Sequence, residues 1–282
     1  LATYDDEVLV QLLEAAAADD DLLGTGYDGD DLDDLLADIA SDVDDDPGAG
    51  AVPDDPITRR GDLIILGEHR LVCGDSFDLA VLDEAVAGLP VGCVLTDPPY
   101  GIDLDSGEIT VVKAVTNTDG PFDSAPFITR FGDVREQFWW GADYYRATIP
   151  EGDLAGSWLV WDKRVDESLD AVIGSAFELC WSRQKHQRRI LRHVWTNYNS
   201  HDNDGHARAH PTEKPVAMLR DILDRWAPDK CRVVDPFAGS GTTLIAAHKT
   251  GRTCSAVEID PGYCDVIVTR WEEATGQTAM RP

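Results

Sequence analysis

Apolar and polar positions alternate along the chain in blocks that predict strands and helices in turn. Short continuous apolar runs, typical of buried strands, lie at 91–96, 157–161, 177–181, 190–196, 232–235 and 253–258. Stretches with helical spacing lie at 79–87, 165–175, 213–226, 241–250 and 261–274. Two further runs, 62–66 and 70–73, are joined by a short polar turn and predict a hairpin. The pattern therefore predicts an α/β fold with a doubly wound, mostly parallel sheet.

The first 56 residues differ from the rest. Apolar stripes at 8–13 and 32–39 predict two short helices, and residues 42–56 combine Asp, Gly and Pro into a linker that we expect not to pack. We therefore divide the chain into an acidic helical extension, residues 1–56, and a folded domain, residues 57–282.

Charge is distributed unevenly. The formal net charge is −29, and at first sight such acidity argues against a nucleic-acid partner. However, residues 1–60 carry 19 acidic side chains and only two arginines, so more than half of the excess lies in the extension. The charge of the domain alone leaves a nucleic-acid partner open.

Neither a membrane-spanning segment nor a signal peptide is evident in the apolar pattern. The six cysteines are scattered, mostly inside apolar runs, and form no CxxC pair. We interpret them as small buried hydrophobic residues of a cytoplasmic protein, without a disulfide or metal role.

A glycine-rich turn follows the predicted strand 232–235. It reads Asp235-Pro236-Phe237-Ala238-Gly239-Ser240-Gly241-Thr242-Thr243 and opens a helix. Glycines at such a turn allow a sharp bend and let a ligand lie against the backbone. Glu258 ends the next strand, where dinucleotide-binding folds place an acid that binds ribose hydroxyls.

A second motif follows the predicted strand 91–96 and reads Asp97-Pro98-Pro99-Tyr100-Gly101. At the carboxyl end of a parallel strand it places a carboxylate, a proline carbonyl and an aromatic ring where ligands of open α/β sheets bind. An exocyclic amine that donates one hydrogen to Asp97 and one to the Pro98 carbonyl would be aligned for attack on a methyl group without a covalent intermediate. Tyr100 would stack on a flipped base, a contact worth roughly 1–3 kcal/mol.

Together the two motifs resemble those of the β-class amino-group DNA methyltransferases, in which the catalytic motif precedes the cofactor motif. The resemblance covers about residues 58–275 and includes Gly74-Asp75, His210-Pro211-Thr212-Glu213-Lys214-Pro215 and Ala256-Val257-Glu258. It implies a Rossmann-like fold that binds S-adenosylmethionine. The cofactor residues that it implies are Asp75, Thr212, Lys214, Asp235, Phe237, Ala238, Gly239, Gly241, Thr242 and Glu258, and the catalytic residues are Asp97, Pro98, Pro99 and Tyr100.

Asp at the first catalytic position favours the N6 amine of adenine, by resemblance, over the N4 amine of cytosine. The chain has no Pro-Cys dipeptide, which argues against methylation of a ring carbon, because that reaction needs a cysteine nucleophile. Two alternatives stay open: a cytosine N4 methyltransferase, and a catalytically silent protein of the same fold that binds DNA.

A basic segment stands out in so acidic a chain. Residues 182–212 carry six Lys or Arg against two Asp, and we take 182–209 as a candidate target-recognition segment. Arg183, Lys185, Arg188 and Arg189 are predicted to contact the backbone of double-stranded DNA. The stretch 201–206, although rich in His and Asp, is interpreted as a polar loop without a metal.

Three further expectations concern context. Residues 102–135 read as an irregular, mobile loop beside the catalytic motif, and Trp139 and Trp140 as core residues. The extension resembles the spacer between a ParB-like domain and a methyltransferase in fusion proteins, and a plain acidic tail is the alternative. A homodimer and a restriction-modification partner are both left open.

Overall fold

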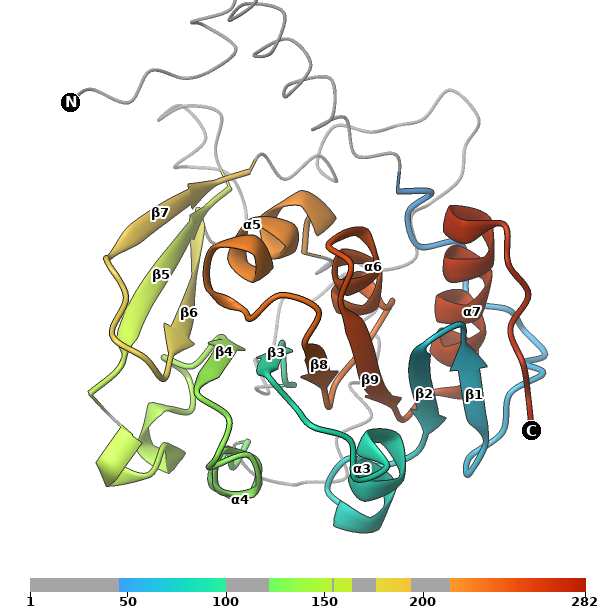
Figure 1. Cartoon of the computed structure of the whole chain (residues 1–282), viewed down its shortest axis with the longest axis horizontal. Coiled ribbons are helices and arrows are strands. Elements are labelled where there is room, and N and C mark those ends of the chain that lie inside the picture. The colour runs from blue at the N-terminus through green and yellow to red at the C-terminus, as the bar shows by residue number, and fades with distance from the viewer. Residues whose placement is uncertain (1–45, 100–121, 154, 164–175, 194–213) are drawn as a thin grey trace, which may run out of the picture. The chain divides into compact units, whose positions relative to one another are not determined.

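The computed structural model describes residues 46–99, 122–153, 155–163, 176–193 and 214–282. The chain divides into two compact units, residues 1–45 and 46–282, and all the described elements belong to the second (Figure 1). Tyr100, Thr212, the expected helices of the extension and the expected helix 165–175 lie outside the described residues.

The described strands form one sheet in the order β1-β2-β9-β8-β3-β4-β6-β5-β7 (Figure 1). Their bounds are β1 Leu63–Leu66, β2 His69–Cys73, β3 Cys93–Thr96, β4 Glu136–Trp140, β5 Ser157–Asp162, β6 Phe177–Ser182, β7 Arg189–Arg192, β8 Arg232–Asp235 and β9 Thr253–Glu258. The segment β2-β9-β8-β3-β4 is parallel throughout, whereas β1 pairs antiparallel with β2 and β6 pairs antiparallel with β4 and β5. The parallel centre confirms the Rossmann-like α/β fold.

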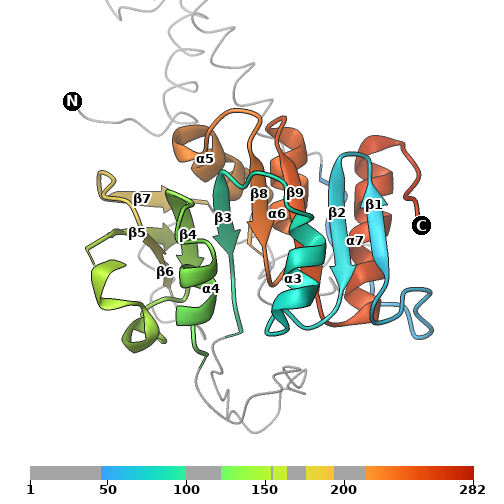
Figure 2. The same cartoon turned by 60° about the horizontal axis from the view of Figure 1, so that its bottom comes forward.

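Alternate residues of each central strand feed two separate cores, because successive side chains of a strand point to opposite faces. Cys93 and Leu95 of β3 join one core, and Val94 joins the other. The first core contains side chains of α5 Val216–Trp226, α6 Thr242–Lys249 and α7 Pro261–Thr275. The second contains side chains of α3 Leu79–Val86 and α4 Ala125–Arg130, so the sheet lies between two helical layers (Figure 2).

Local sequence explains where the longest helix begins and ends. Asp260 caps α7 by accepting hydrogen bonds from the backbone N–H groups of Gly262 and Tyr263, and Pro261 occupies the first turn, where its missing N–H costs nothing. Gly276 ends the helix in the left-handed conformation, with φ of 67°.

The predicted hairpin and most of the other predicted elements are confirmed, with ends that agree with the structure to within one to three residues. In the described residues, one strand, one α-helix and two short 3-10 helices, Arg146–Thr148 and Glu151–Asp153, were not predicted. Strand β4 lies in the middle of the sheet, and α4 lies within the segment 102–135 that was expected to be irregular, so that expectation is wrong for its described part. Trp139 and Trp140 of β4 are buried, as predicted.

The compact unit also begins earlier than the pattern indicated. Residues 46–56 were assigned to a linker that does not pack, yet Ala49 is buried and Asp46 pairs with Arg270 of α7. All six cysteines are free thiols, five buried and Cys231 partly so, which agrees with their interpretation as small core residues. In the part of the chain that the structure describes, no helix has the length and apolarity needed to cross a membrane.

Candidate active site

Four neighbouring strands end at the same edge of the sheet and carry the candidate residues there. β2, β9, β8 and β3 are mutually parallel, so the residues that follow them meet at the carboxyl edge. Asp97 follows β3, while Asp235 and Glu258 end β8 and β9. Asp75 follows β2, and the N–H of the preceding Gly74 donates to the Glu258 carbonyl at 2.8 Å. The two motifs, separate in the sequence, are therefore adjacent in the fold.

Asp235 joins β3, the strand that precedes Asp97, to the glycine-rich turn. Its Oδ1 accepts hydrogen bonds from Thr96 Oγ1 at 2.7 Å and from the Phe237 N–H at 3.0 Å. Burial raises the pKa of the Asp235 carboxyl to about 6, and these hydrogen bonds oppose the rise. The carboxyl therefore fixes the position of Asp97 relative to the turn.

The glycine-rich turn has room for a ligand on one side and a packed helix on the other. Gly239 has φ of +53°, and a Cβ built on it would meet no atom within 4 Å. Gly241 has φ of +86°, but a Cβ there would stand 2.9 Å from Cγ1 of Ile267 in α7. Hence Gly239 faces open space, whereas Gly241 lets the turn lie against α7.

Glu258 closes the turn from the neighbouring strand. Its Oε2 accepts from the Gly239 N–H at 2.7 Å and its Oε1 from the Asp260 N–H at 2.9 Å. Burial raises the pKa of Glu258 to about 7, and the two backbone hydrogen bonds work in the opposite direction. A carboxyl with this pKa changes its charge near neutral pH.

Asp97 stands at one end of a chain of alternating charges. Its Oδ2 accepts from Lys214 Nζ at 2.5 Å, and the same ammonium lies 2.9 Å from Oε2 of Glu178. Glu178 Oε1 in turn pairs with Lys163 Nζ. Lys214 is only 5% exposed and lies over the rings of Trp140 and Trp161. A buried ammonium between two carboxylates fixes the orientation of both.

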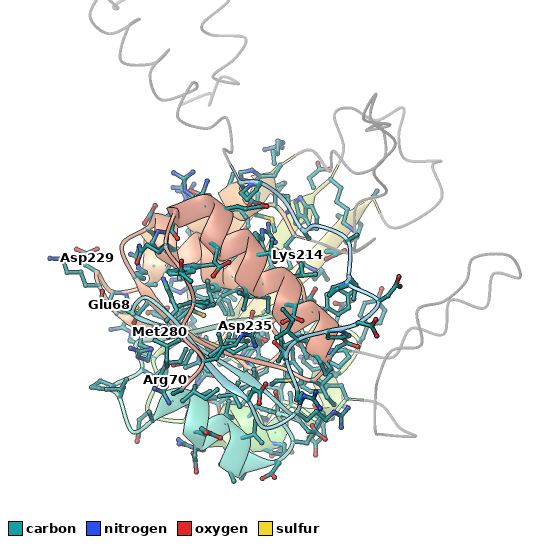
Figure 3. The ribbon with its side chains drawn as sticks, turned by 90° about the vertical axis from the view of Figure 1, so that its right-hand side faces the viewer. Glu68, Arg70, Lys214, Asp229, Asp235 and Met280 are labelled. Atoms are coloured by element: carbon teal, nitrogen blue, oxygen red, sulfur yellow. The ribbon has the colours of Figure 1, made fainter. Side chains whose placement is uncertain are left out.

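Lys214 and Asp235 are buried, with exposed fractions of 5% and 3%. Asp229, by contrast, is fully exposed and projects from the edge of the molecule in Figure 3. Burial raises the pKa of Glu178, but the nearby positive charges of Lys214 and Lys163 outweigh this and lower it overall. Glu178 is therefore a carboxylate at neutral pH.

The structure brings together nearly all described residues of the predicted cofactor set. Those at the turn or beside it are Asp75, Asp235, Phe237, Ala238, Gly239, Gly241, Thr242 and Glu258. The Phe237 ring packs against Phe127, with centroids 5.2 Å apart. Lys214 differs, because its ammonium donates to the carboxylate of Asp97, a residue predicted to be catalytic. Pro98 and Pro99 follow Asp97 directly, Pro98 buried and Pro99 partly buried.

The residues predicted to contact DNA do not share this edge. Because β6 runs antiparallel to β4, Arg183 and Lys185 lie at the amino edge of the sheet, opposite Asp97. Arg183 also holds the fold together: its Nε pairs with Asp153 at 2.7 Å and its Nη1 donates to the Gly132 carbonyl. Arg188 and Arg189 are exposed at the start of edge strand β7.

An open pocket of about 540 Å³ lies at the same amino edge, separate from the candidate active site. Its lining residues are Gly132, Asp133, Arg135, Gly152, Asp153, Ala155, Arg183, Gln184 and Lys185. The acids Asp133 and Asp153 offset part of its positive charge, and Asp153 already pairs with Arg183. We therefore give this pocket no role in the chemistry at Asp97.

Glu178 and Lys163 were missed in the sequence. A glutamate in an apolar run, the second residue of Phe177–Ser182, was a usable signal, since an acid inside a buried strand needs a partner.

Within the described ranges, no three or more His, Cys, Asp or Glu side chains are grouped to hold a metal ion.

Comparison with known proteins gives one family. The family model described as DNA methylase, N6_N4_Mtase, matches residues 128–269, half of the chain. Curated relatives match over shorter stretches. The type II methyltransferase M.ScaI of Streptomyces caespitosus is 39% identical over 64 residues, which are 23% of this chain and 21% of the relative. The putative methylase YubD of Escherichia coli is 44% identical over 56 residues, 20% of this chain and 25% of the relative.

The type II methyltransferase M2.DpnII of Streptococcus pneumoniae is 30% identical over 82 residues, 29% of this chain and 31% of the relative. The matches thus span less than a third of the length of these three relatives. Among solved structures, M1.HpyAVI aligns with a TM-score of 0.46 at 18% identity, covering 71% of this chain and 96% of that one. The cytosine-N4-specific PvuII DNA methyltransferase aligns with a TM-score of 0.46 at 16% identity, covering 72% and 86%.

Proposed function

Because this chain belongs to the N6_N4_Mtase family of DNA methylases, we propose that it transfers a methyl group from S-adenosylmethionine to the N6 amine of adenine in double-stranded DNA. One observation carries the proposal. The Asp97-Pro98-Pro99 segment and the glycine-rich turn stand side by side at the carboxyl edge, joined by the 2.7 Å hydrogen bond between Thr96 and Asp235. The proposed acceptor for the amine and the proposed cofactor site are therefore neighbours.

The residues present fit S-adenosylmethionine. The open space beside Gly239 lets a ligand approach the backbone, and Glu258 and Asp75 supply carboxylates for hydroxyl and amine donors. The N-terminus of α6, which begins at Thr242, adds a favourable field for a negatively charged carboxylate. When bound, this cofactor supplies an electrophilic methyl group on a positively charged sulfur.

Asp97 and Pro98 prepare the amine. The lone pair of an exocyclic amine is delocalised into the base, so the nitrogen is a weak nucleophile. An amine that donates one hydrogen to the Asp97 carboxylate and one to the Pro98 carbonyl is held with its lone pair out of the ring plane. The negative charge of Asp97 also stabilises the positive charge that develops on the nitrogen.

Lys214 is proposed to position Asp97 in addition to, or in place of, the cofactor contact that the family resemblance implies. An ammonium on Oδ2 holds the carboxylate in one rotamer, and Glu178 and Lys163 hold the ammonium. Pre-organised charges of this kind accelerate a reaction because they need not reorient when charge develops.

The proposed partner is double-stranded DNA, and the basic residues in the described part of the segment differ in how well they are placed to contact it. Arg188 and Arg189 stay as candidate backbone contacts at the start of β7, and the exposed Arg192 ends the same strand at the edge that holds Asp97. Lys185 is exposed but lines the pocket at the amino edge beside two acids, so we expect a weaker contribution from it. Arg183 is left out because its Nε already binds Asp153 and its Nη1 binds backbone carbonyls.

Identification of the methylated base tests the proposal. The full chain is incubated with DNA and S-adenosylmethionine labelled in the methyl group, and the DNA is digested to nucleosides for mass spectrometry. Label in N6-methyldeoxyadenosine is the expected result. Label in N4-methyldeoxycytidine would assign the alternative target, and binding of DNA without transfer would assign the silent alternative.

A further inference from the structure

Residues 46–58, here called the strap, run from the start of the compact unit along α7. Thr58 donates from its N–H and its hydroxyl to the carboxylate of Asp265 in α7. Val52 lies over Gly262, where a Cβ would stand 2.5 Å from Val52 Cγ1. Asp46 pairs with Arg270, 224 residues further along the chain. The strap thus contacts α7 along most of its length.

Arg270 is buried between the strap and the glycine-rich turn. Its side chain is only 1% exposed. Nε donates to Asp46 Oδ1 at 2.9 Å and Nη2 pairs with Asp46 Oδ2, a two-point contact. On its other side Nη1 donates to the Ser240 carbonyl at 3.0 Å and lies 3.4 Å from Thr242 Oγ1. One guanidinium therefore joins the strap to the turn.

The contact of Arg270 with the glycine-rich turn depends on its pairing with Asp46. A guanidinium in a dry interior needs a carboxylate, because an unpaired buried charge costs far more than the pair gains. Among the described residues, Asp46 is the acid that pairs with Arg270, and its side chain is only 9% exposed. Without it, Arg270 is drawn toward water and away from the Ser240 carbonyl, which lies between Gly239 and Gly241.

We infer that Asp46 and Arg270 are positioning residues for the cofactor: Asp46 keeps Arg270 in place, and Arg270 holds the glycine-rich turn in the conformation that receives the ligand. The inference rests on the proposed function for the identity of that ligand. It makes cofactor affinity depend on a residue of the acidic N-terminal region, far upstream in the sequence.

The first test measures the turn without cofactor, in the full chain. Amide hydrogen exchange at 238–243 is compared for the unmodified chain, Asp46→Asn and Asp54→Asn. Asp54 is an exposed acid of the same strap, so its variant removes one charge without touching Arg270. Exchange is expected to rise about tenfold in Asp46→Asn, as loss of a charged hydrogen bond implies, and to stay unchanged in Asp54→Asn. Equal exchange in all three proteins would overturn the inference.

The second test separates positioning from simple stabilisation. The double variant Asp46→Leu with Arg270→Met replaces the ion pair by apolar side chains, a change that buried pairs often tolerate. The affinity for S-adenosylhomocysteine is measured by calorimetry below the unfolding transition of each protein, with DNA affinity as the control. Both Asp46→Asn and the double variant are expected to bind it about tenfold more weakly, with DNA affinity unchanged.

A folded double variant that binds S-adenosylhomocysteine as tightly as the unmodified chain would overturn the positioning role. If the unmodified chain itself does not bind, the proposed function fails. The exchange experiment still decides whether Asp46 and Arg270 hold the turn, because it needs no ligand.

Discussion

A single lysine shows how a side chain acquires its role from its surroundings. Lys214 was assigned to the cofactor by family resemblance, and the fold places its ammonium between Asp97 and Glu178. The sequence did not indicate this, because Glu178 lies on β6, a strand between Asp97 and Lys214 in the chain but antiparallel to its neighbour β4. Antiparallel insertion brings its acid to the carboxyl edge, and apolar patterning does not report strand direction.

Replacement of Lys214 by Met removes the cation between these two carboxylates. The turnover number is expected to fall about tenfold to a hundredfold, equivalent to the ~1.5–3 kcal/mol of a charged hydrogen bond. Lys163→Met is the matched control: this lysine touches Glu178 but is one step further from Asp97, so the loss should be smaller. Steady-state kinetics with DNA decides. If Lys214→Met instead loses cofactor affinity at unchanged turnover, the assignment from family resemblance is correct and ours is wrong.

If Glu258 accepts hydrogen bonds from the ribose of the cofactor, as we propose, cofactor binding depends on pH. Burial raises its pKa to about 7, so in the folded protein the carboxyl is largely protonated at pH 6 and ionised at pH 8. Ribose hydroxyls donate to the ionised form, so the dissociation constant for S-adenosylhomocysteine should fall as pH rises from about 6 to 8 and then level off. Calorimetric titration across this range checks the prediction, and Glu258→Gln should flatten the curve.

The same shift affects folding in the opposite direction. A raised carboxyl pKa stabilises the folded protein fully below the ordinary value of 4.5, and this contribution is lost as pH rises through about 7. A cofactor affinity that is constant with pH in both the unmodified chain and Glu258→Gln would contradict a ribose contact by Glu258.

At the scale of elements, the two glycines of the turn separate binding from folding. Gly239→Leu and Gly241→Leu both force a left-handed residue, at a cost of roughly 1–2 kcal/mol. At Gly239 the new side chain enters open space, so the protein should fold and lose cofactor-induced thermal stabilisation. At Gly241 it meets Ile267, so the melting temperature itself should fall further. Thermal melts with and without S-adenosylhomocysteine test both, and equal behaviour of the two variants would contradict this division.

Elements with clear apolar runs could be predicted from the sequence, whereas β4 could not. Strand β4 starts with Glu136 and Gln137, which are typical of surface positions, yet both are buried. Glu136 pairs with His186 at 2.9 Å, and Gln137 donates to the Phe131 carbonyl at 2.7 Å. Phe131 lies only six residues from Gln137, but His186 comes from a distant segment, so the local apolar pattern could not indicate that Glu136 has a buried partner.

At the scale of the whole molecule, the boundary between the two units is a testable feature. The apolar pattern placed the start of the folded domain at residue 57, whereas the compact unit begins at Asp46. Deletion of 1–45 should leave the free energy of unfolding unchanged. Deletion of 1–57 also removes Asp46, which pairs with the buried Arg270, and should lower the free energy of unfolding by about 3–5 kcal/mol. Urea unfolding of both truncated chains makes the comparison, and equal stability would contradict a structural role for the strap.

The acidity of residues 1–45 should also weaken DNA binding. Residues 1–45 carry 16 acidic side chains and no Lys or Arg, so their deletion removes more than half of the net charge of −29. DNA affinity should therefore rise, and by more at low salt than at high salt, because the repulsion is screened. Fluorescence anisotropy with labelled duplex at several salt concentrations measures this. Unchanged affinity at low salt would mean that the extension does not influence the DNA-binding surface.

The central claim is that Asp97 aligns the amine that is methylated, and Asp97→Ala tests it most directly. Lys214 keeps Glu178 as a partner in this variant, and the glycine-rich turn is untouched, so fold and cofactor affinity should change by no more than a few-fold. The measurement is the single-turnover rate of N6-methyladenine formation in duplex DNA at saturating S-adenosylmethionine. We expect that rate to fall by about a hundredfold to a thousandfold. Methylation by Asp97→Ala at near the rate of the unmodified chain would contradict the account.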